Sequence, residues 1–149
     1  MTGTVFRLAS DADLDIYASW FADAELARRL SRPTPEWRAY VRQPDCAFWV
    51  ALGDAGQPVA AFQTEHAENG DVFFDCAIDP RGRGRGLMAP ILADFVAGPA
   101  GDAARLIAEA ETDNHASLRL LRRAGFLEAQ EGATEGFVRF VFVRQDGLG

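Results

Sequence analysis

The sequence contains no lysine, few cysteines and no long apolar run. All 15 basic residues are arginines, and 22 acidic residues outnumber them, so the formal net charge is −7. A net negative chain is a poor general partner for nucleic acid and a suitable host for a cationic small molecule. We attribute the missing lysine to genome composition and draw no chemical conclusion from it. The charge balance therefore argues against a nucleic-acid-binding protein.

The scarcity of cysteine and of long apolar segments bears on the cellular compartment. Cys46 and Cys76 both lie in apolar stretches, and the segment from Met1 to Arg7 has neither the basic nor the apolar part of a signal peptide. Two such thiols indicate buried, reduced cysteines of a cytoplasmic protein. No apolar run approaches the roughly 18 residues of a membrane span, so no membrane contact is expected. No metal is expected either, because His, Cys and acidic residues nowhere cluster with ligand spacing.

Length and periodicity predict one α+β domain over residues 1–149. Helices are predicted where apolar residues recur every three or four positions, and strands where they alternate or form short runs. Local signals support the boundaries: Ser10 with Asp13 begins a helix, Asn69-Gly70 forms a hairpin turn, and Gly98 ends a helix. In chain order we expect a strand at 4–8, helices at 11–21, 26–30 and 35–41, strands at 47–52, 58–64 and 72–78, a helix at 87–96, a strand at 105–110, a helix at 114–123, a strand from 125 and a strand at 137–143.

The segment Arg81-Gly-Arg-Gly-Arg-Gly86 lies between a predicted strand and a predicted helix, and three interpretations of it are open. An arginine-glycine tract can bind RNA or form a charged loop, although this one is short and the chain is acidic. Gly84-x-Gly86-x-x-Ala89 fits a dinucleotide-binding fingerprint, but the chain has no repeated strand–helix–strand units. A glycine turn before a helix N-terminus also directs several backbone N–H groups to one point, where they can hold a pyrophosphate.

The same segment resembles the phosphate loop of the GCN5-related N-acetyltransferase (GNAT) family. That loop has the form Gln/Arg-x-x-Gly-x-Gly/Ala and follows Val-x-Pro; the matching residues here are Ile78-Asp79-Pro80 and then Arg83-Gly84-Arg85-Gly86-Leu87-Met88. We prefer the register from Arg83 because it keeps the proline spacing and places Leu87 and Ile91 on the apolar stripe of the helix. This register places Met88 in the last position of the pattern, where the family has glycine or alanine. A register from Arg81 matches both glycines but puts an arginine where an apolar residue is usual.

A second segment resembles the family's N-x-x-S-x-x-x-Y-x-x-x-G-F pattern, and the likeness extends over nearly the whole chain. The resemblance implies that Asn114 hydrogen-bonds the pantetheine arm of acetyl-CoA and that Ser117 lies beside it. Both residues could also serve only as the N-terminal cap of a plain helix. Leu121 stands where many relatives have a tyrosine that protonates the departing thiolate. The thiolate is therefore expected to leave as an anion or to take its proton from water.

The resemblance also implies a fold and an activity. The fold is a mixed, largely antiparallel central sheet with helices on both faces. The activity is the transfer of an acetyl group from acetyl-CoA, a co-substrate, to a primary amine by direct attack in a ternary complex. The acceptor would be a small-molecule or peptide amine, and a homodimer is an open possibility. Because Leu121 replaces the tyrosine, a CoA- or nucleotide-binding module without acyltransferase activity remains the alternative.

Candidate residues for the chemistry lie on two predicted strands. The backbone of Cys76, Ala77 and Ile78 is implied by the resemblance to meet the thioester and the pantetheine. Asp75 is the first candidate for the general base, since a carboxylate in a central apolar strand needs an explanation; an ion pair with a neighbouring arginine is the other one. Glu111, with Glu109, is the next candidate, or a solvated edge charge. An acyl-cysteine route through Cys76 is disfavoured because an apolar strand raises the pKa of a thiol.

Overall fold

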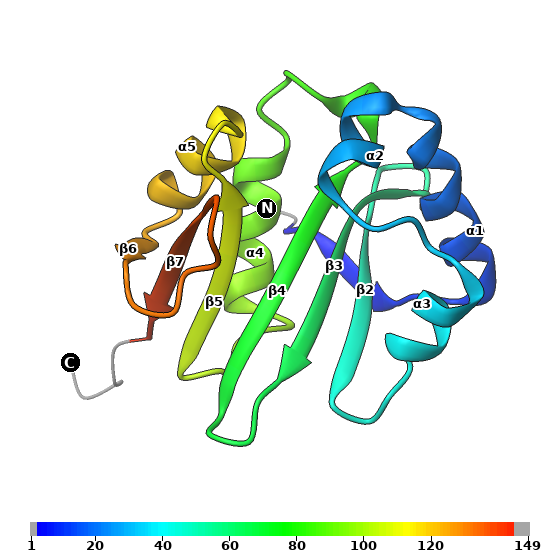
Figure 1. The fold of residues 1–149 in the computed structure, drawn as a ribbon. Coiled ribbons are helices and arrows are strands. Elements are labelled where there is room, and N and C mark those ends of the chain that lie inside the picture. The colour runs from blue at the N-terminus through cyan, green and yellow to red at the C-terminus, as the bar shows by residue number, and fades with distance from the viewer. Residues whose placement is uncertain (1–2, 145–149) are drawn as a thin grey trace.

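The computed structural model describes residues 3–144, in which all strands join one mixed sheet of order β1-β2-β3-β4-β5-β7-β6 (Figure 1). Every pairing in this sheet is antiparallel except the parallel pair of β4 and β5. The predicted α+β fold with a largely antiparallel sheet is therefore confirmed. The strands are β1 (Val5–Leu8), β2 (Cys46–Leu52), β3 (Pro58–His66), β4 (Asp71–Ile78), β5 (Arg105–Glu111), β6 (Leu127–Ala129) and β7 (Phe137–Val143).

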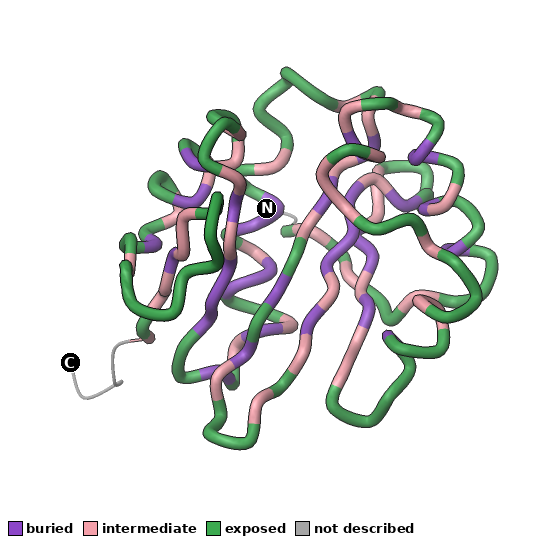
Figure 2. Tube along the Cα trace, in the orientation of Figure 1, coloured by how far each residue is buried: buried purple, intermediate pink, exposed green. Residues whose placement is uncertain are grey.

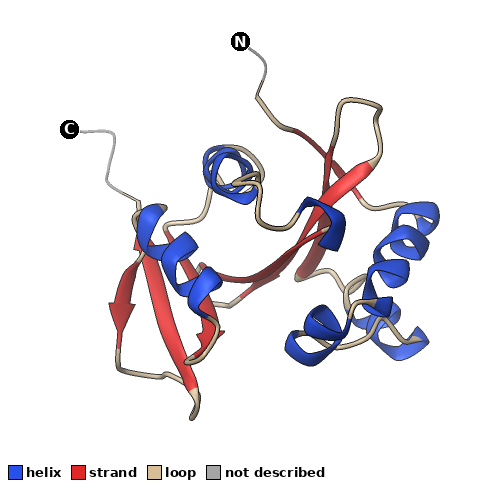
Figure 3. Cartoon of the chain, turned by 90° about the horizontal axis from the view of Figure 1, so that it is seen from above, coloured by secondary structure: helices blue, strands red, loops and turns tan. Residues whose placement is uncertain are grey.

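Helices cover both faces of the sheet, as the view from above in Figure 3 shows. Helices α4 and α5 pack on one face, and α1, η1 and α2 pack with the strands on the other. The helical elements are α1 (Asp11–Ser19), the 3₁₀ turn η1 (Trp20–Ala22), α2 (Ala24–Arg29), α3 (Pro35–Tyr40), the 3₁₀ turn η2 (Pro80–Gly82), α4 (Met88–Ala97) and α5 (His115–Arg123).

Strand alternation divides the core into two clusters, one on each face of the sheet. In β2, Ala51 belongs to the cluster under α4 and α5, whereas its neighbour Val50 belongs to the cluster under α1. The buried residues run along the central strands and the inward sides of the helices (Figure 2). In the first cluster the rings of Phe62 and Phe95 stack with centroids 4.0 Å apart. Each face of β3 and β4 is therefore committed to a different layer of helices.

Local signals predicted the element boundaries well. Ser10 and Asp13 form a reciprocal capping box at the start of α1, Gly70 has a φ of 92° in the β3–β4 turn, and Gly98 is the C-cap of α4. Each of these residues shapes the backbone of a few adjacent residues only, so a short sequence pattern can reveal it. This is why the helix and strand positions agree closely with the prediction.

Three details of the prediction are wrong. Leu87 is not on the buried stripe of α4: the helix begins at Met88, and Leu87 is its N-cap residue and is 41% exposed. The last hairpin begins at β6 and not at residue 125, because Gly125 has a φ of 94° and turns the chain first. Both cysteines are free thiols, but they are partly rather than fully buried.

Candidate active site

The strands β4 and β5 are paired over only a short length and then separate. Their parallel pairing joins Asp71–Phe73 of β4 with Arg105–Ile107 of β5. Beyond these residues the two strands diverge, and Figure 1 shows the gap widening toward the end of the sheet next to α2. The rest of β4, from Phe74 to Ile78, therefore has a strand partner on its β3 side only.

The hydrogen-bond pattern of β4 determines which backbone groups face this gap. Just beyond one end of the β3–β4 ladder, the Asp79 N–H donates to the Val59 carbonyl oxygen. At the other end, the Ala67 N–H donates to the Asp71 carbonyl oxygen. In an antiparallel ladder, every second residue directs its backbone N–H and C=O groups to the partner strand. The odd-numbered residues of β4, including Ala77, therefore direct these groups to β3. Of the three residues predicted to offer backbone groups, Cys76 and Ile78 face the gap and Ala77 does not. The expectation for the backbone of Ala77 is corrected accordingly.

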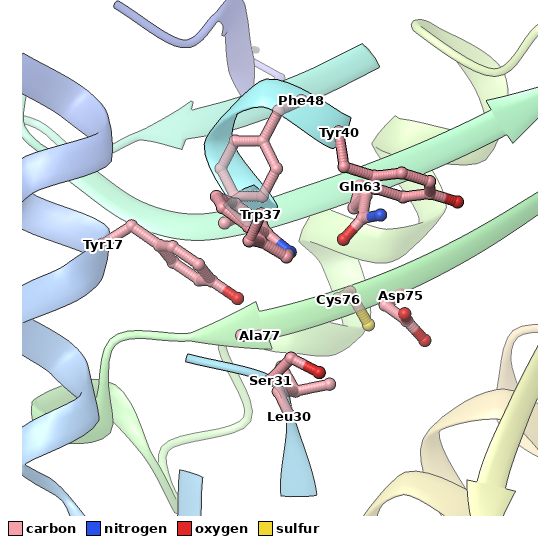
Figure 4. A pocket seen from close by; sticks show the side chains of 11 residues that line it. Tyr17, Leu30, Ser31, Trp37, Tyr40, Phe48, Gln63, Asp75, Cys76 and Ala77 are labelled. Atoms are coloured by element: carbon pink, nitrogen blue, oxygen red, sulfur yellow. The ribbon is translucent and has the colours of Figure 1, made fainter. Parts of the chain in front are cut away.

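Two cavities open on the face of the sheet that carries α1, and Asp75 lines both of them. The first, about 300 Å³, extends from Asp75 to the aromatic side chains of Tyr17, Trp37 and Phe48 (Figure 4). The second, about 180 Å³, lies where β4 and β5 separate and includes Glu109. Asp75 thus stands between a hollow beneath the N-terminal helices and a hollow beside the gap.

Asp75 and Glu109 have pKa values shifted in opposite directions. Asp75 is accessible to solvent, but it lies between the two cavities, where its carboxylate is only partly hydrated. This partial desolvation, and then the charge of Glu109, raises the pKa of Asp75. Burial alone would raise the pKa of Glu109 too. Hydrogen bonds from Thr134 and Arg139 outweigh that effect and lower it. Glu109 therefore stays ionised, while Asp75 is the carboxylate that holds a proton more readily.

The alternative role considered for Asp75, an ion pair with a nearby arginine, is not formed. Within residues 3–144 no arginine or histidine nitrogen lies within 4.0 Å of the Asp75 carboxylate. Glu111 differs, since it accepts a hydrogen bond of 3.1 Å from Arg29 of α2. Arg29 also contacts Glu25 and Asp113 and joins α2 to the turn after β5. Glu111 is thus engaged in a structural contact, and Asp75 is the freer carboxylate.

The arginine-glycine loop combines two glycines at positive φ with an open helix N-terminus. Gly84 and Gly86 have φ values of 81° and 71°, which L side chains rarely adopt, and a Cβ added at either would meet nothing within 4 Å. The N-cap residue of α4, Leu87, provides no side-chain cap, and Pro90 in the first turn has no N–H. The positive end of α4 therefore faces an exposed glycine loop, an arrangement that suits a phosphate group.

The two central arginines of the loop differ in their contacts. Arg83 donates to both carboxylate oxygens of Asp23, at 2.8 and 3.3 Å, while Asp23 also caps α2 by accepting from Leu26 N–H. These hydrogen bonds lower the pKa of Asp23. Arg85 is exposed and forms no ion pair with any acidic side chain in the part of the chain that the structure describes. One arginine is thus tied to α2 and the other is available.

The second predicted cofactor segment lies at the start of α5. The Asn114 side-chain oxygen accepts from Ser117 N–H at 3.3 Å, so Asn114 is the N-cap of α5. The capping interpretation is correct, and it leaves the Asn114 side-chain N–H₂ without a hydrogen bond to residues 3–144. Leu121 is 4% exposed and belongs to the core under α4 and α5. The chain therefore offers an amide at the expected position and a packed leucine where a tyrosine is usual.

Sequence reasoning missed the polar neighbour of Asp75. Gln63 of β3 is the cross-strand partner of Asp75 and lines both cavities. A glutamine directly after the apolar run from Val59 to Phe62 was the available signal, but its position opposite Asp75 depends on the hairpin register. Tyr17 has its pKa raised by burial and then by Asp75, and Figure 4 shows its hydroxyl directed toward β4. It therefore stays protonated, so its hydroxyl can donate a hydrogen bond there but cannot act as a base.

Two kinds of feature are absent from the described part of the chain. Residues 3–144 contain no group of three His, Cys, Asp or Glu side chains arranged to hold a metal ion. None of the described helices is long and apolar enough to cross a membrane.

Several solved structures share this fold at low sequence identity. An aminoglycoside N(6')-acetyltransferase from Legionella pneumophila has 17% identity and a TM-score of 0.78, with 96% of this chain and 94% of that chain covered. An aminoglycoside acetyltransferase in complex with coenzyme A and kanamycin has 17% identity and a TM-score of 0.79, with 95% of each chain covered. A spermidine N-acetyltransferase chimera from Vibrio cholerae and hSSAT has 12% identity and a TM-score of 0.74, with 95% of this chain and 96% of that chain covered. At these identities the likeness establishes the fold alone.

Comparison with protein families gives a more specific result. No curated protein matches the sequence significantly. The model of the acetyltransferase (GNAT) domain matches residues 3–127, which include the N-terminal helices, the gap between β4 and β5, the glycine loop and α5. The resemblance noted in the two sequence motifs thus extends over most of the chain, and the protein belongs to the GNAT acetyltransferase family.

Proposed function

We propose that this chain is an acetyl-CoA-dependent N-acetyltransferase that acetylates a primary amine by direct attack in a ternary complex, with residues 1–149 as one acyltransferase domain. One observation carries the proposal: Asp75, unpaired by any described cation, lines two cavities at the point where β4 and β5 separate. A carboxylate beside an open strand edge can receive a proton from an amine that attacks a carbonyl group held at that edge.

The glycine loop supports the binding of acetyl-CoA as the co-substrate. Gly84 and Gly86 leave open space over the loop, and the uncapped N-terminus of α4 favours an anion. Arg83 and Arg85 add donors that carry positive charge. We assign the pyrophosphate to residues 83–88 and the pantetheine arm to the Asn114 amide, with Ser117 beside it. A structural neighbour that binds coenzyme A supports the use of acetyl-CoA as the co-substrate.

Asp75 acts as the general base in the proposed reaction. When bound, acetyl-CoA supplies the electrophilic carbonyl carbon and the thiolate leaving group. Asp75 accepts the proton that the ammonium form of the acceptor must lose, directly or through water. The neutral amine nitrogen then bonds to the carbonyl carbon while the carbon–sulfur bond breaks, and the electron pair of that bond leaves with the sulfur. The nitrogen passes its second proton to water, which leaves a neutral amide. The N–H groups of Cys76 and Ile78 face the gap and can stabilise the developing negative charge on the carbonyl oxygen.

The remaining side chains favour direct attack over a covalent intermediate. Burial, with the charge of Asp75, raises the pKa of the Cys76 thiol to about 12, so it is protonated and weakly nucleophilic at neutral pH. Leu121 cannot donate a proton to the departing thiolate. We infer that the thiolate leaves as an anion or takes a proton from water, as its pKa of about 8.5 permits. Glu111, paired with Arg29, is the second candidate for the base.

One observation, the leucine at position 121, favours an alternative function. A GNAT domain without the tyrosine could bind CoA, or another nucleotide, without catalysing transfer. The test is the release of thiol from acetyl-CoA in the presence of a panel of primary amines, with calorimetric titration of acetyl-CoA and NADH beside it. We expect tighter binding of acetyl-CoA than of NADH, and amine-dependent thiol release. Binding without release for every amine would favour the alternative, and tighter binding of NADH would refute the assignment of the loop.

A further inference from the structure

The first cavity has a size and a lining that restrict what it can hold. Its volume, about 300 Å³, is at the lower end of the range for small-molecule sites, roughly 300–1,000 Å³. One end is formed by aromatic side chains of α1, α3 and β2, and the other by Asp75 of β4 (Figure 4). An occupant must therefore be small and must differ in chemistry between its two ends.

The aromatic end is a rigid wall. Tyr17 and Trp37 stack with centroids 5.6 Å apart and an interplanar angle of 24°, and Phe48 meets both edge-on at 4.9 and 5.2 Å. Tyr17 is 5% exposed and Phe48 is 6% exposed, so the core beneath holds both. These rings already cover one another's faces. The wall therefore offers apolar surface on which a flat group can pack. It does not offer several free ring faces that could surround a second ammonium ion.

The charge in this cavity is that of a single carboxylate. Among the described residues that line it, Asp75 is the one acid, and no arginine or histidine lines it. Glu65 lines the second cavity and accepts a hydrogen bond from the hydroxyl of Tyr40, which lines this one. One ammonium group placed at Asp75 would be paired, whereas a second one deeper in the cavity would have no carboxylate beside it.

We propose that the acceptor is a small monoamine in which a short chain joins one ammonium group to a flat aromatic body. This inference rests on the proposed function and specifies the substrate class of the same site. The nitrogen lies at Asp75, next to the gap between β4 and β5, and the ring lies against Trp37 and Tyr17. The substrates named for two structural neighbours, kanamycin and spermidine, carry several cationic groups and no aromatic ring, so they fit this cavity poorly.

A steady-state comparison of amines tests the substrate class. Thiol release from acetyl-CoA is measured with 2-phenylethylamine, 2-cyclohexylethylamine, spermidine and kanamycin. We expect kcat/KM for 2-phenylethylamine to exceed the values for spermidine and kanamycin at least about tenfold, with the non-planar cyclohexyl compound between them. An equal or larger kcat/KM for spermidine or kanamycin overturns this inference and leaves the proposed function standing.

A direct binding measurement tests the ligand class separately from the proposed function. Calorimetric titration with the same amines needs no turnover. Binding of 2-phenylethylamine in preference to spermidine, without thiol release, would overturn the proposed function and support the ligand class. If 2-phenylethylamine does not bind more tightly than spermidine, the ligand class is wrong.

Two variants locate the ligand in the cavity. Trp37→Ala should weaken the binding of 2-phenylethylamine about fivefold to tenfold. The matched control Trp49→Ala, which removes a half-buried tryptophan packed against the other face of the sheet, should not weaken it. Asp75→Asn, at an accessible position that tolerates the change, should weaken it at least about tenfold and leave acetyl-CoA affinity unchanged. Unaltered amine affinity in Asp75→Asn would overturn the placement even if Trp37→Ala failed to fold.

Discussion

Arg83 of the glycine loop and Asp23 at the start of α2 form a two-pronged hydrogen-bonded ion pair across 60 positions of sequence. Asp23 simultaneously caps α2, which lies on the side of the sheet that carries the aromatic cavity. The same guanidinium group is the one that the proposed function assigns to the pyrophosphate. Under that proposal, a bound phosphate would compete with Asp23 for Arg83. The contact also links the glycine loop to the N-terminal helices.

The first prediction concerns this competition. Asp23→Asn keeps an oxygen to cap α2 but removes the charge that holds Arg83, so acetyl-CoA should bind about two- to fivefold more tightly. Calorimetric titration measures the change, and thermal melting should show little effect on Tm. The control Asp15→Asn breaks the exposed pair with Arg38 elsewhere on the surface and should leave the affinity unaltered. Weaker acetyl-CoA binding in Asp23→Asn would mean that the pair orients Arg83 for the phosphate rather than withholding it.

The second prediction concerns the glycine loop. Gly86→Asp introduces a side chain and a negative charge where the pyrophosphate is assigned, so acetyl-CoA binding should be abolished while the fold survives. Gly56→Asp is the matched control, because Gly56 has a similar φ of 79° and equally open surroundings in the β2–β3 turn. The two variants should lose similar stability, since both strain a left-handed position. Full acetyl-CoA affinity in a folded Gly86→Asp variant would show that the loop is not the phosphate site.

The third prediction concerns Asp75. Asp75→Asn is nearly isosteric and cannot accept a proton, so kcat should fall about 10²- to 10⁴-fold. In the wild-type enzyme the rate should rise with pH as Asp75 ionises and the bound amine becomes neutral. A variant that keeps full turnover between about pH 7 and 9 would assign Asp75 a structural role and direct the search to Glu109 and Glu111.

The fourth prediction uses the raised pKa of Asp75 as a stability signature. A carboxyl group whose pKa is raised by folding stabilises the protein while it is protonated, and this contribution is lost as the pH rises through the folded-state pKa. At neutral pH the ionised group therefore opposes folding. Asp75→Asn should raise Tm at neutral pH, and the difference should vanish below the ordinary pKa of an aspartate, about 3.9. A lower Tm at neutral pH would indicate a stabilising partner for the carboxylate.

The fifth prediction concerns the packed leucine of α5. Leu121 is 4% exposed beneath α4, so Leu121→Tyr should overpack the core and lower the free energy of unfolding by about 1–3 kcal/mol. Urea denaturation measures this loss, and Leu121→Met should cost less because it nearly conserves volume. Turnover of the folded fraction should not fall, since a hydroxyl here would sit where relatives protonate the thiolate. A fully stable Leu121→Tyr variant with much reduced turnover would mean that the α5 motif is misaligned.

The sequence by itself determined the features that depend only on residues close together in the chain, such as helix caps and turns. Ser10 and Asp13 satisfy N–H groups of their own helix, Asn69-Gly70 allows its own turn, and Asn114 caps the helix that it begins. The phosphate-loop pattern also depends on a few consecutive residues, so the order of amino acids is enough to reveal it. Leu87 marks the limit of such reasoning, because the precise start of a helix depends on its packing.

Tertiary structure alone decided how distant segments meet. The separation of β4 from β5 depends on how many residues two non-adjacent strands pair, and the alternation of the β3–β4 ladder turned Cys76 and Ile78, but not Ala77, toward the gap. The ion pair of Arg83 with Asp23 and the freedom of Asp75 from any described cation follow from the docking of helices onto strands. Periodicity marks a face as apolar or polar but carries no information on which faces come together. Long-range packing therefore placed one free carboxylate between an aromatic cavity and an open strand edge.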